Sequence, residues 1–408
     1  MSHTTAILDF AAAPHVLPAN VRADAERLLA DTLAVMAAGA ASDVAAMVRA
    51  IAPDPAFFNG FAIHCLEWDA VHEPAVVHAL SVVTAALLAA SNRRGGSDPD
   101  DFLAALAVGV DIASGLGIAA TGPMRFFRPA TAGVIGAALA VARLDGLTRE
   151  QMADVLGLAY SFAGGTMQAH VEGSVALPLQ IARAAQGAVQ AVDLVKSGLN
   201  GPHNVLEGPF GYSALIEPLD LSRYKPGAPW RISDVSIKPF PSGRASHAVL
   251  ATIADVRQSG REIANITAHV PPLIERLVGR LYTDDMTPAY ARLCLPLLCA
   301  LMHRDGRIDP RRFTPETFTN PLIKSLAAKV AVVRDRNPDG NALSPQRIII
   351  DYADGSQDDL TINATLGSPN APMTYAQAVA KYDLCRVLAS DCDPRIFDNP
   401  LAYATEPA

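Results

Sequence analysis

Residues 130–144 read ATAGVIGAALAVARL, a run whose apolar residues would cover most faces of a helix. Runs of the same kind occupy residues 22–38, 100–118 and 149–163. The chain is 50 % hydrophobic and only 6 % aromatic, with many alanines, and this favours closely packed helices over a sheet sandwich. We therefore predict a buried helical assembly that extends from residue 22 to about residue 200.

The pattern changes near residue 225, where prolines become frequent and short β-branched segments begin. These segments predict strands at residues 235–237, 263–270 and 329–333, and a hairpin formed by residues 347–352 and 358–362 around Ala353-Asp354-Gly355. Residues 374–388 return to a helical pattern that could pack back on the first part of the chain.

These patterns predict a mostly α fold with two domains. The larger domain is all helical and comprises residues 1–233 together with 367–408. The smaller domain is α+β and comprises residues 234–366. Thr148 is the expected cap between two of the helices in the larger domain.

Charge and cysteine content restrict the function. The formal net charge of -8 argues against a nucleic-acid partner or an acidic membrane surface. Five cysteines without CxxC spacing indicate neither a disulfide framework nor a zinc ribbon. We find no signal-peptide pattern in residues 1–13, and the longest apolar run, residues 75–90, is too short for a membrane span. We expect a cytoplasmic protein that acts on a small molecule and has no membrane partner.

Residues 59–81 read NGFAIHCLEWDAVHEPAVVHALS, which places three histidines and three carboxylates among residues of core type. Titratable groups among apolar neighbours tend to have shifted pKa values, and acid/base chemistry at neutral pH requires such groups. The stretch therefore indicates a proton-handling site. The alternative is that these side chains cap helix ends and pair with one another inside a helical core.

This stretch resembles the Asn-Gly, His, acidic cluster and His pattern of the MmgE/PrpD family. Further matches follow in the family's order: Gly201-Pro202, Leu206-Glu207-Gly208, Gly211-Tyr212, Lys238-Pro239-Phe240-Pro241-Ser242 with His247, Gly367-Ser368-Pro369 and Lys381-Tyr382. The family includes 2-methylcitrate dehydratase, cis-aconitate decarboxylase and iminodisuccinate epimerase. The resemblance implies a homodimer with a site between the domains, no cofactor and no metal, and removal of a proton next to a carboxylate of a small di- or tricarboxylic acid.

Such a reaction builds negative charge on the substrate carboxylate, so the site needs a base on one side and cations facing the oxygens. His78 is the preferred base, with Asp69 or Glu67 orienting it, and Lys238 completes the catalytic candidates. The candidates for substrate binding are Arg244, His247, Arg128, Ser242 and His64. For Lys238 and Arg244 the alternative is a solvated turn between domains. His170 and His203 lie near glycine-rich turns and are further candidates for the pocket or the surface.

The sequence also departs from the family pattern. Arg128 stands where the family has a histidine, Leu177 where it has a lysine, and Leu297 where it has a tyrosine. These changes remove polar groups expected for decarboxylation of the cis-aconitate kind. Three functions are left open: a cofactor-independent lyase of the dehydratase or decarboxylase type, an epimerase or isomerase of a similar acid, and a non-catalytic relative that binds carboxylates.

Overall fold

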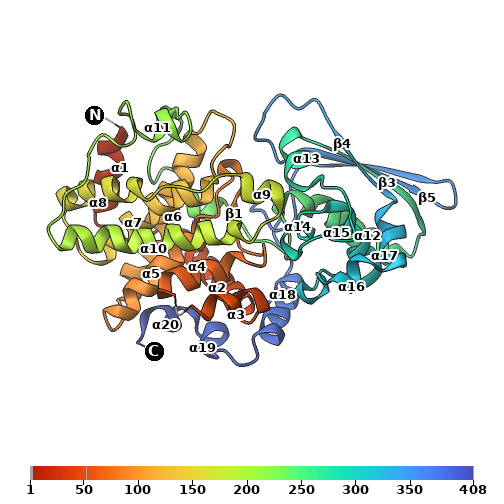
Figure 1. The fold of residues 1–408 in the computed structure, drawn as a ribbon, viewed down its shortest axis with the longest axis horizontal. Helices are drawn as coiled ribbons and strands as arrows, with labels where there is room; N and C mark the ends of the chain where they lie inside the picture. The colour runs from red at the N-terminus through yellow and green to blue at the C-terminus, as the bar shows by residue number, and fades with distance from the viewer. Residues whose placement is uncertain (1–2, 52, 408) are drawn as a thin grey trace.

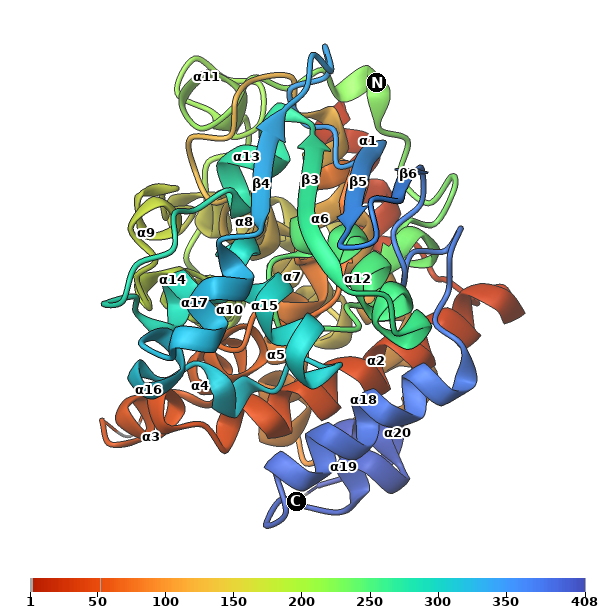
Figure 2. The same ribbon diagram turned by 90° about the vertical axis from the view of Figure 1, so that its right-hand side faces the viewer.

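A computed structural model describes residues 3–51 and 53–407. Helices fill one end of the molecule and a four-stranded sheet with its own helices forms the other, as Figure 1 and Figure 2 show. The prediction of a mostly α fold, with a large helical part and a smaller α+β part, is confirmed. The residue limits proposed for the two domains stay a prediction.

The helical part contains the long helices that the apolar runs predicted. Its elements are α1 (His3–Ala12), α2 (Ala19–Ala40), α3 (Asp43–Arg49), α4 (Pro55–His64), α5 (Ala79–Arg93), α6 (Pro99–Ala119), α7 (Arg128–Leu144), α8 (Arg149–Ser161), α9 (Gln168–Glu172), α10 (Ala176–Lys196) and α11 (Tyr212–Leu215). Thr148 caps α8 as expected, because its side chain accepts from the backbone N–H of Gln151 while the Gln151 side chain accepts from the N–H of Thr148.

The centre of this part is a close contact between α6 and α7. A Cβ atom on Gly136 would lie 2.3 Å from the carbonyl oxygen of Gly109, so only glycine allows the two backbones to approach this closely. Helix α6 is long and apolar enough to cross a membrane, but 94 % of its most apolar window is buried inside the protein. Burial in the core therefore accounts for its composition.

The α+β part is built on a mixed sheet with the strand order β4-β3-β5-β6. Its strands are β3 (Ile263–Val270), β4 (Val330–Arg334), β5 (Gln346–Tyr352) and β6 (Gln357–Ile362). Strand β4 runs parallel to β3, while β5 is antiparallel to β3 and pairs with β6 in the predicted hairpin. Strand β5 alternates between buried and more exposed residues, which is typical of a sheet with one covered face (Figure 2).

The helices of this part and of the C-terminal segment complete the chain. They are α12 (His247–Ser259), α13 (Pro272–Val278), α14 (Pro288–Ala291), α15 (Leu295–Asp305), α16 (Pro315–Phe318), α17 (Pro321–Ala327), α18 (Tyr375–Leu388), α19 (Arg395–Asp398) and α20 (Pro400–Thr405), with short 3-10 turns at η1 (Glu73–Ala75), η2 (Leu221–Arg223), η3 (Arg231–Asp234), η4 (Arg244–Ser246) and η5 (Pro310–Arg312).

Two contacts connect segments that are far apart in the sequence. Strand β1 (Val71–His72) pairs antiparallel with β2 (Val235–Ser236), which brings the segment that follows β2 beside the loop that precedes β1. Helix α18 packs on α2, where Lys381 and Asp31 form a buried ion pair of 2.5 Å. Helix α18 thus packs back on the helical part, as the sequence predicted for residues 374–388.

The buried pair in α18 generates a test of stability. Lys381→Met should lower the free energy of unfolding by about 3–5 kcal/mol, because it leaves Asp31 buried without its cation. Arg386→Met is the matched control on the same helix, since the Arg386–Asp398 pair is more than half exposed and should contribute at most about 1 kcal/mol. Urea unfolding of both variants measures the difference, and equal losses would contradict it.

Candidate active site

The site begins where α4 ends at His64 and the chain turns towards β1. Glu67 adopts a left-handed backbone with φ of 56°, which costs a residue with a side chain about 1–3 kcal/mol. The turn is held by the Glu67 N–H, which donates to the His64 carbonyl at 2.9 Å, and by the Trp68 indole N–H, which donates to the Pro239 carbonyl at 3.3 Å. This conformation directs the Glu67 side chain towards a cavity.

Asp69 is the centre of a buried polar cluster and is fully inaccessible to solvent. One of its carboxylate oxygens, Oδ2, lies 2.9 Å from Nδ1 of His64 and 2.9 Å from Nδ1 of His78, and it also accepts a hydrogen bond from the Ser81 hydroxyl. The two imidazole rings stand nearly perpendicular, with their centroids 5.0 Å apart. This oxygen therefore hydrogen-bonds to His64, and His78 lies at ion-pair distance from the same oxygen.

Lys238 reaches this cluster from the segment that follows β2. Its ammonium group donates to the Glu67 carbonyl at 2.9 Å, and its Nζ atom lies 3.4 Å from Oε2 of Glu67 and 3.8 Å from Oδ1 of Asp69. The side chain is completely buried, so the alternative of a solvated turn is wrong for Lys238. The structure brings together all the catalytic candidates, His78, Asp69, Glu67 and Lys238, and it adds His64 to them.

The two histidines have opposite pKa shifts although they share one carboxylate. Burial disfavours the charged form of His64, but attraction to Asp69 and to Glu67 outweighs burial and raises its pKa. For His78 burial dominates over the attraction of Asp69, and repulsion from Lys238 adds to it, so the pKa is lowered. The pKa values of the two neighbouring imidazoles are therefore moved apart, so His64 holds its proton to a higher pH than His78 does.

The carboxylates remain ionised despite burial. Burial raises the pKa of Asp69, but His64, His78 and Lys238 together hold it well below its ordinary value. Glu67 behaves in the same way, since His64 and Lys238 outweigh the effect of burial and lower its pKa. The cluster is thus a set of fixed charges with one imidazole that is free to accept a proton.

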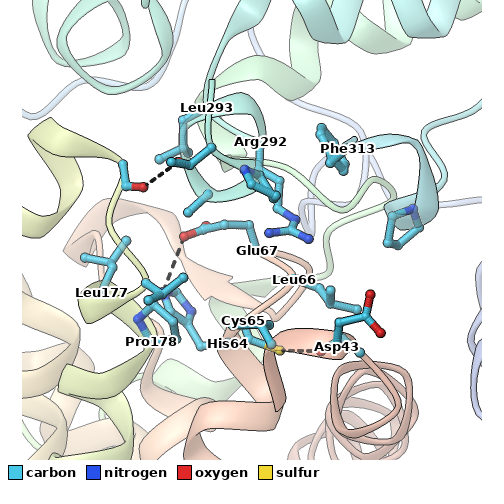
Figure 3. Close-up of a pocket in the computed structure, with 18 of the residues that line it drawn as sticks. Asp43, His64, Cys65, Leu66, Glu67, Leu177, Pro178, Arg292, Leu293 and Phe313 are labelled. Carbon is cyan, nitrogen blue, oxygen red and sulfur yellow. Dashed lines mark hydrogen bonds and ion pairs between the residues drawn. The ribbon is translucent and has the colours of Figure 1, made fainter. Parts of the chain in front are cut away.

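Two cavities meet at this cluster. The larger, of about 690 Å³, lies between the helical part and the segments around α14, α15 and η5, and the smaller, of about 60 Å³, reaches His78. Both cavities are lined by His64, Glu67, His170, Leu177 and Leu293. Figure 3 shows Glu67 pointing into the larger cavity above His64. A ligand in the cavities could therefore contact His64, Glu67 and His78, while the buried Asp69 and Lys238 act through them.

The cluster contains a possible set of metal ligands. Among the described residues, His64, Asp69 and His78 each offer one ligand atom, and these atoms lie within 4.8 Å of one another. However, the Lys238 ammonium group already lies 3.8 Å from Asp69 and would repel a divalent cation. The charge balance therefore favours protons over a metal ion at this position.

The turn that carries Arg244 is buried, so the solvated alternative is also wrong for this residue. Its guanidinium donates to Glu73 at 2.7 Å and to the carbonyls of Leu366 and Thr365, which occupies most of its N–H groups, although it lines the smaller cavity. Ser242 and His247 bond to each other behind this turn, with 3.1 Å between Oγ and Nε2, and line neither of the two cavities. Their role in substrate binding stays a prediction.

Arg128 is not brought to the cluster. Its Nε donates to Glu217 at 2.9 Å, a second nitrogen contacts the same carboxylate, and the third donates to the Ala75 carbonyl at 2.7 Å. Each of its three side-chain nitrogens thus donates inside the helical part, and the residue lies on the wall of a separate cavity with Arg223 and Arg276. The expectation that Arg128 faces the substrate carboxylate disagrees with this geometry, because a bidentate pair with Glu217 satisfies the guanidinium.

Sequence reasoning missed Arg292, which precedes α15 and lines the larger cavity (Figure 3). The side chain is only 7 % exposed, yet among the described residues its guanidinium has no hydrogen bond or ion pair, and its recorded contact is the Phe313 ring at 5.1 Å. The one available signal was a lone arginine in the otherwise apolar run from residue 291 to 302.

The other two histidine candidates differ in position. His170 lines both cavities, and burial together with repulsion from Arg280 lowers its pKa to about 4. His203 is on the surface, where its side chain is 66 % exposed and pairs with Asp154. His170 therefore belongs to the cavity wall, while His203 does not.

Comparison with known proteins gives two family matches that together cover most of the chain. Residues 51–221 match the MmgE/PrpD N-terminal domain and residues 240–391 match the MmgE/PrpD C-terminal domain. Human cis-aconitate decarboxylase is 28 % identical over 295 residues, which are 67 % of this chain and 60 % of the human protein. The cis-aconitate decarboxylase-like protein oryM of Aspergillus oryzae is 29 % identical over 74 % of this chain and 68 % of its own length. The chain thus spans about 60 % of the length of its human relative.

The opposite shifts of the two histidines predict how they titrate. His64 should titrate above 6.5 and His78 below it, so the His64 proton stabilises the fold below about pH 6.5 and this contribution is lost as the pH rises through the raised pKa. Lowering the pKa of His78 acts in the opposite sense, because the fold loses stability as the pH falls below 6.5.

Nuclear magnetic resonance of histidine-labelled protein measures both values, with His64→Gln and His78→Gln assigning the signals. Asp69→Asn should lower both pKa values, because it removes the attraction that favours each imidazolium. His15 is the control, since its pKa is lowered by its own burial near Phe10 and should not respond. A His64 that titrates below His78 in the unmodified protein would contradict the assignment.

Proposed function

This chain belongs to the MmgE/PrpD family, and from that premise we propose that it is a lyase that acts on a small di- or tricarboxylic acid with its own side chains as acid and base. The observation that carries the proposal is the pair of histidines beside Asp69 at the wall of a shared cavity, where the pKa of His64 is raised and that of His78 is lowered. Pairs of titratable groups with separated pKa values are typical of sites that need both an acid and a base.

In the proposed reaction His78 is the base. Its Nδ1 lies 2.9 Å from Asp69, so the carboxylate favours the tautomer that carries a proton on Nδ1 and leaves Nε2 free as the acceptor. Nε2 takes the proton from the carbon next to the substrate carboxylate, and the electron pair of the broken C–H bond moves into that carboxylate and then into a new C=C bond. Asp69 stabilises the imidazolium that forms.

The departing group needs a proton and the substrate carboxylate needs a cation. His64 lies between Asp69 and Glu67, which raise its pKa, and in its protonated form it can donate its Nε2 proton to a leaving hydroxide, so that the C–O bond breaks and water leaves. Arg292 has a free guanidinium at the cavity wall and can bind the substrate carboxylate with two parallel hydrogen bonds. In a decarboxylation no C–H proton is removed: the C–C bond to the leaving carboxylate breaks, carbon dioxide departs, and the electron pair left on carbon takes the proton from His64.

The names of the relatives favour decarboxylation. Leu177 and Leu297 argue against it, because they replace polar residues that the family has at these positions.

An epimerase is the second candidate. The specific observation in its favour is that one imidazole accepts a proton and a second, 5.0 Å away, can return one to the same carbon. We also propose that the chain works as a homodimer, from the family resemblance, and that it is cytoplasmic, from its cysteine pattern.

Hydrogen exchange tests the removal of the proton next to the carboxylate, the first step that the dehydration and the epimerisation share. In deuterated water the protein should catalyse exchange or turnover of at least one acid among cis-aconitate, citrate and aspartate-like dicarboxylates, measured by mass spectrometry of the acid. His78→Gln should reduce the rate about 10²- to 10⁴-fold, because it removes the base while the cavity is kept. His203→Gln changes a surface histidine and should leave the rate unchanged.

The products separate the alternatives. Loss of water or carbon dioxide identifies the lyase, and inversion with deuterium uptake and no loss of mass identifies the epimerase. Acids that bind, but show no exchange at any carbon and no product, would overturn the catalytic proposal and leave a carboxylate-binding relative.

A further inference from the structure

The larger cavity extends well beyond the groups that the proposed chemistry uses. Its volume of about 690 Å³ lies within the range of about 300–1,000 Å³ typical of sites that enclose drug-sized ligands. A small polycarboxylate next to Glu67 and Arg292 would leave much of this space unfilled. The unfilled region continues towards α3 and η5.

The wall of this region is apolar. Leu66, Leu293 and Phe313 line the cavity with Arg292, and each of the three is less than 5 % exposed. Among the other charged residues of the wall, Glu67 belongs to the cluster around Asp69, Asp43 is exposed, and Arg311 is paired with Asp309 at 2.6 Å. Apolar surface of this kind stabilises a ligand in proportion to the apolar area that the ligand buries.

The Arg292 guanidinium indicates which polar group the ligand carries. A buried cation without a close partner is unfavourable, and among the described residues the Arg292 guanidinium has no hydrogen bond or ion pair, while Glu67 attracts it only at longer range and burial lowers its pKa. Its backbone carbonyl accepts from the Gly243 N–H at 3.1 Å, which anchors the residue to the turn before Arg244. A planar guanidinium held in this way is suited to a carboxylate supplied by a ligand.

We propose that the natural substrate is a carboxylic acid that carries an apolar alkyl or aryl group, with one carboxylate on Arg292 and the apolar group in the cavity lined by Leu66 and Phe313. This inference rests on the proposed function for the reaction at His78, and it adds the substrate class. Leu177, which lines both cavities where the family has a lysine, extends the apolar wall towards the reacting groups.

Calorimetric titration with 2-alkylsuccinates from methyl to octyl tests the proposal. The dissociation constant should fall about two- to fourfold for each added methylene until the cavity is filled. Arg292→Gln should weaken the whole series at least about tenfold and keep the dependence on chain length, because it removes a charge-assisted pair. Arg304→Gln is the matched control, since Arg304 on α15 pairs with Asp305 at 2.7 Å away from the cavity.

Ala289→Trp locates the alkyl chain. Ala289 is a partly exposed residue of the cavity wall on α14, so a large ring there should narrow the cavity without disturbing the core, and it should remove the dependence on chain length. Thermal melting of each variant checks folding. A chain-length dependence that survives in Ala289→Trp would place the alkyl group elsewhere and overturn the proposal.

The outcomes separate this inference from the proposed function. If short acids exchange deuterium but affinity does not rise with chain length, the substrate class is wrong and the lyase proposal stands. If affinity rises with chain length but no member of the series exchanges or reacts, the binding preference is supported and the catalytic proposal fails. If Arg292→Gln binds the series as tightly as the unmodified protein, the assignment of the carboxylate to Arg292 is wrong.

Discussion

The Lys238 ammonium group, buried between Glu67 and Asp69, is the interaction on which the arrangement of the site depends. An ammonium group without solvent requires anions at short range, and the loop after α4 supplies two carboxylates and the Glu67 carbonyl. The pairing of β1 with β2 and the bond from Trp68 to Pro239 hold the two segments in register. The helical part and the segment leading into the α+β part are therefore joined by the same contacts that fix the site.

The same charges explain why two adjacent histidines behave differently. His64 lies between two carboxylates, so attraction outweighs the cost of burying its charge. His78 has a single carboxylate, and burial and the repulsion of Lys238 outweigh it. Neither shift requires an unusual residue. The asymmetric placement of one ammonium group and two carboxylates raises the pKa of one imidazole and leaves that of the other lowered.

The sequence predicted those features that local patterns encode. The long helices, the hairpin β5–β6 and the cap at Thr148 follow from periodicity and turn chemistry. The cluster of His64, Glu67, Asp69 and His78 was predictable because its members lie within 15 residues of one another in the sequence. The contact with Lys238 depends on β1 pairing with β2, two very short strands, and only the family resemblance indicated it.

The rest of the site is set by packing that no local pattern describes. Arg128 could not be separated from a substrate-facing arginine by sequence, because Glu217 meets it through the fold. Arg292 escaped notice for the converse reason, since nothing near it in the sequence shows that its guanidinium ends in a cavity without a partner. For both arginines, the group that the fold places next to the guanidinium decides whether it is available to a ligand: Glu217 lies next to Arg128, and a cavity lies next to Arg292.

Three positions of the chain depart from the family pattern. The groups proposed to move protons, His64, His78, Asp69 and Glu67, stay together with Lys238, whereas two of the changed positions, Arg128 and Leu177, lie on cavity walls and the third, Leu297, is buried in the core of the α+β part. Arg128 is neutralised by Glu217 and contributes no free charge, and Leu177 replaces a charge with apolar surface. For the proposed function, the positive charge that faces a substrate comes from Arg292, on the opposite part of the molecule. The departures at Arg128 and Leu177 therefore change cavity walls and leave the buried cluster of charges intact.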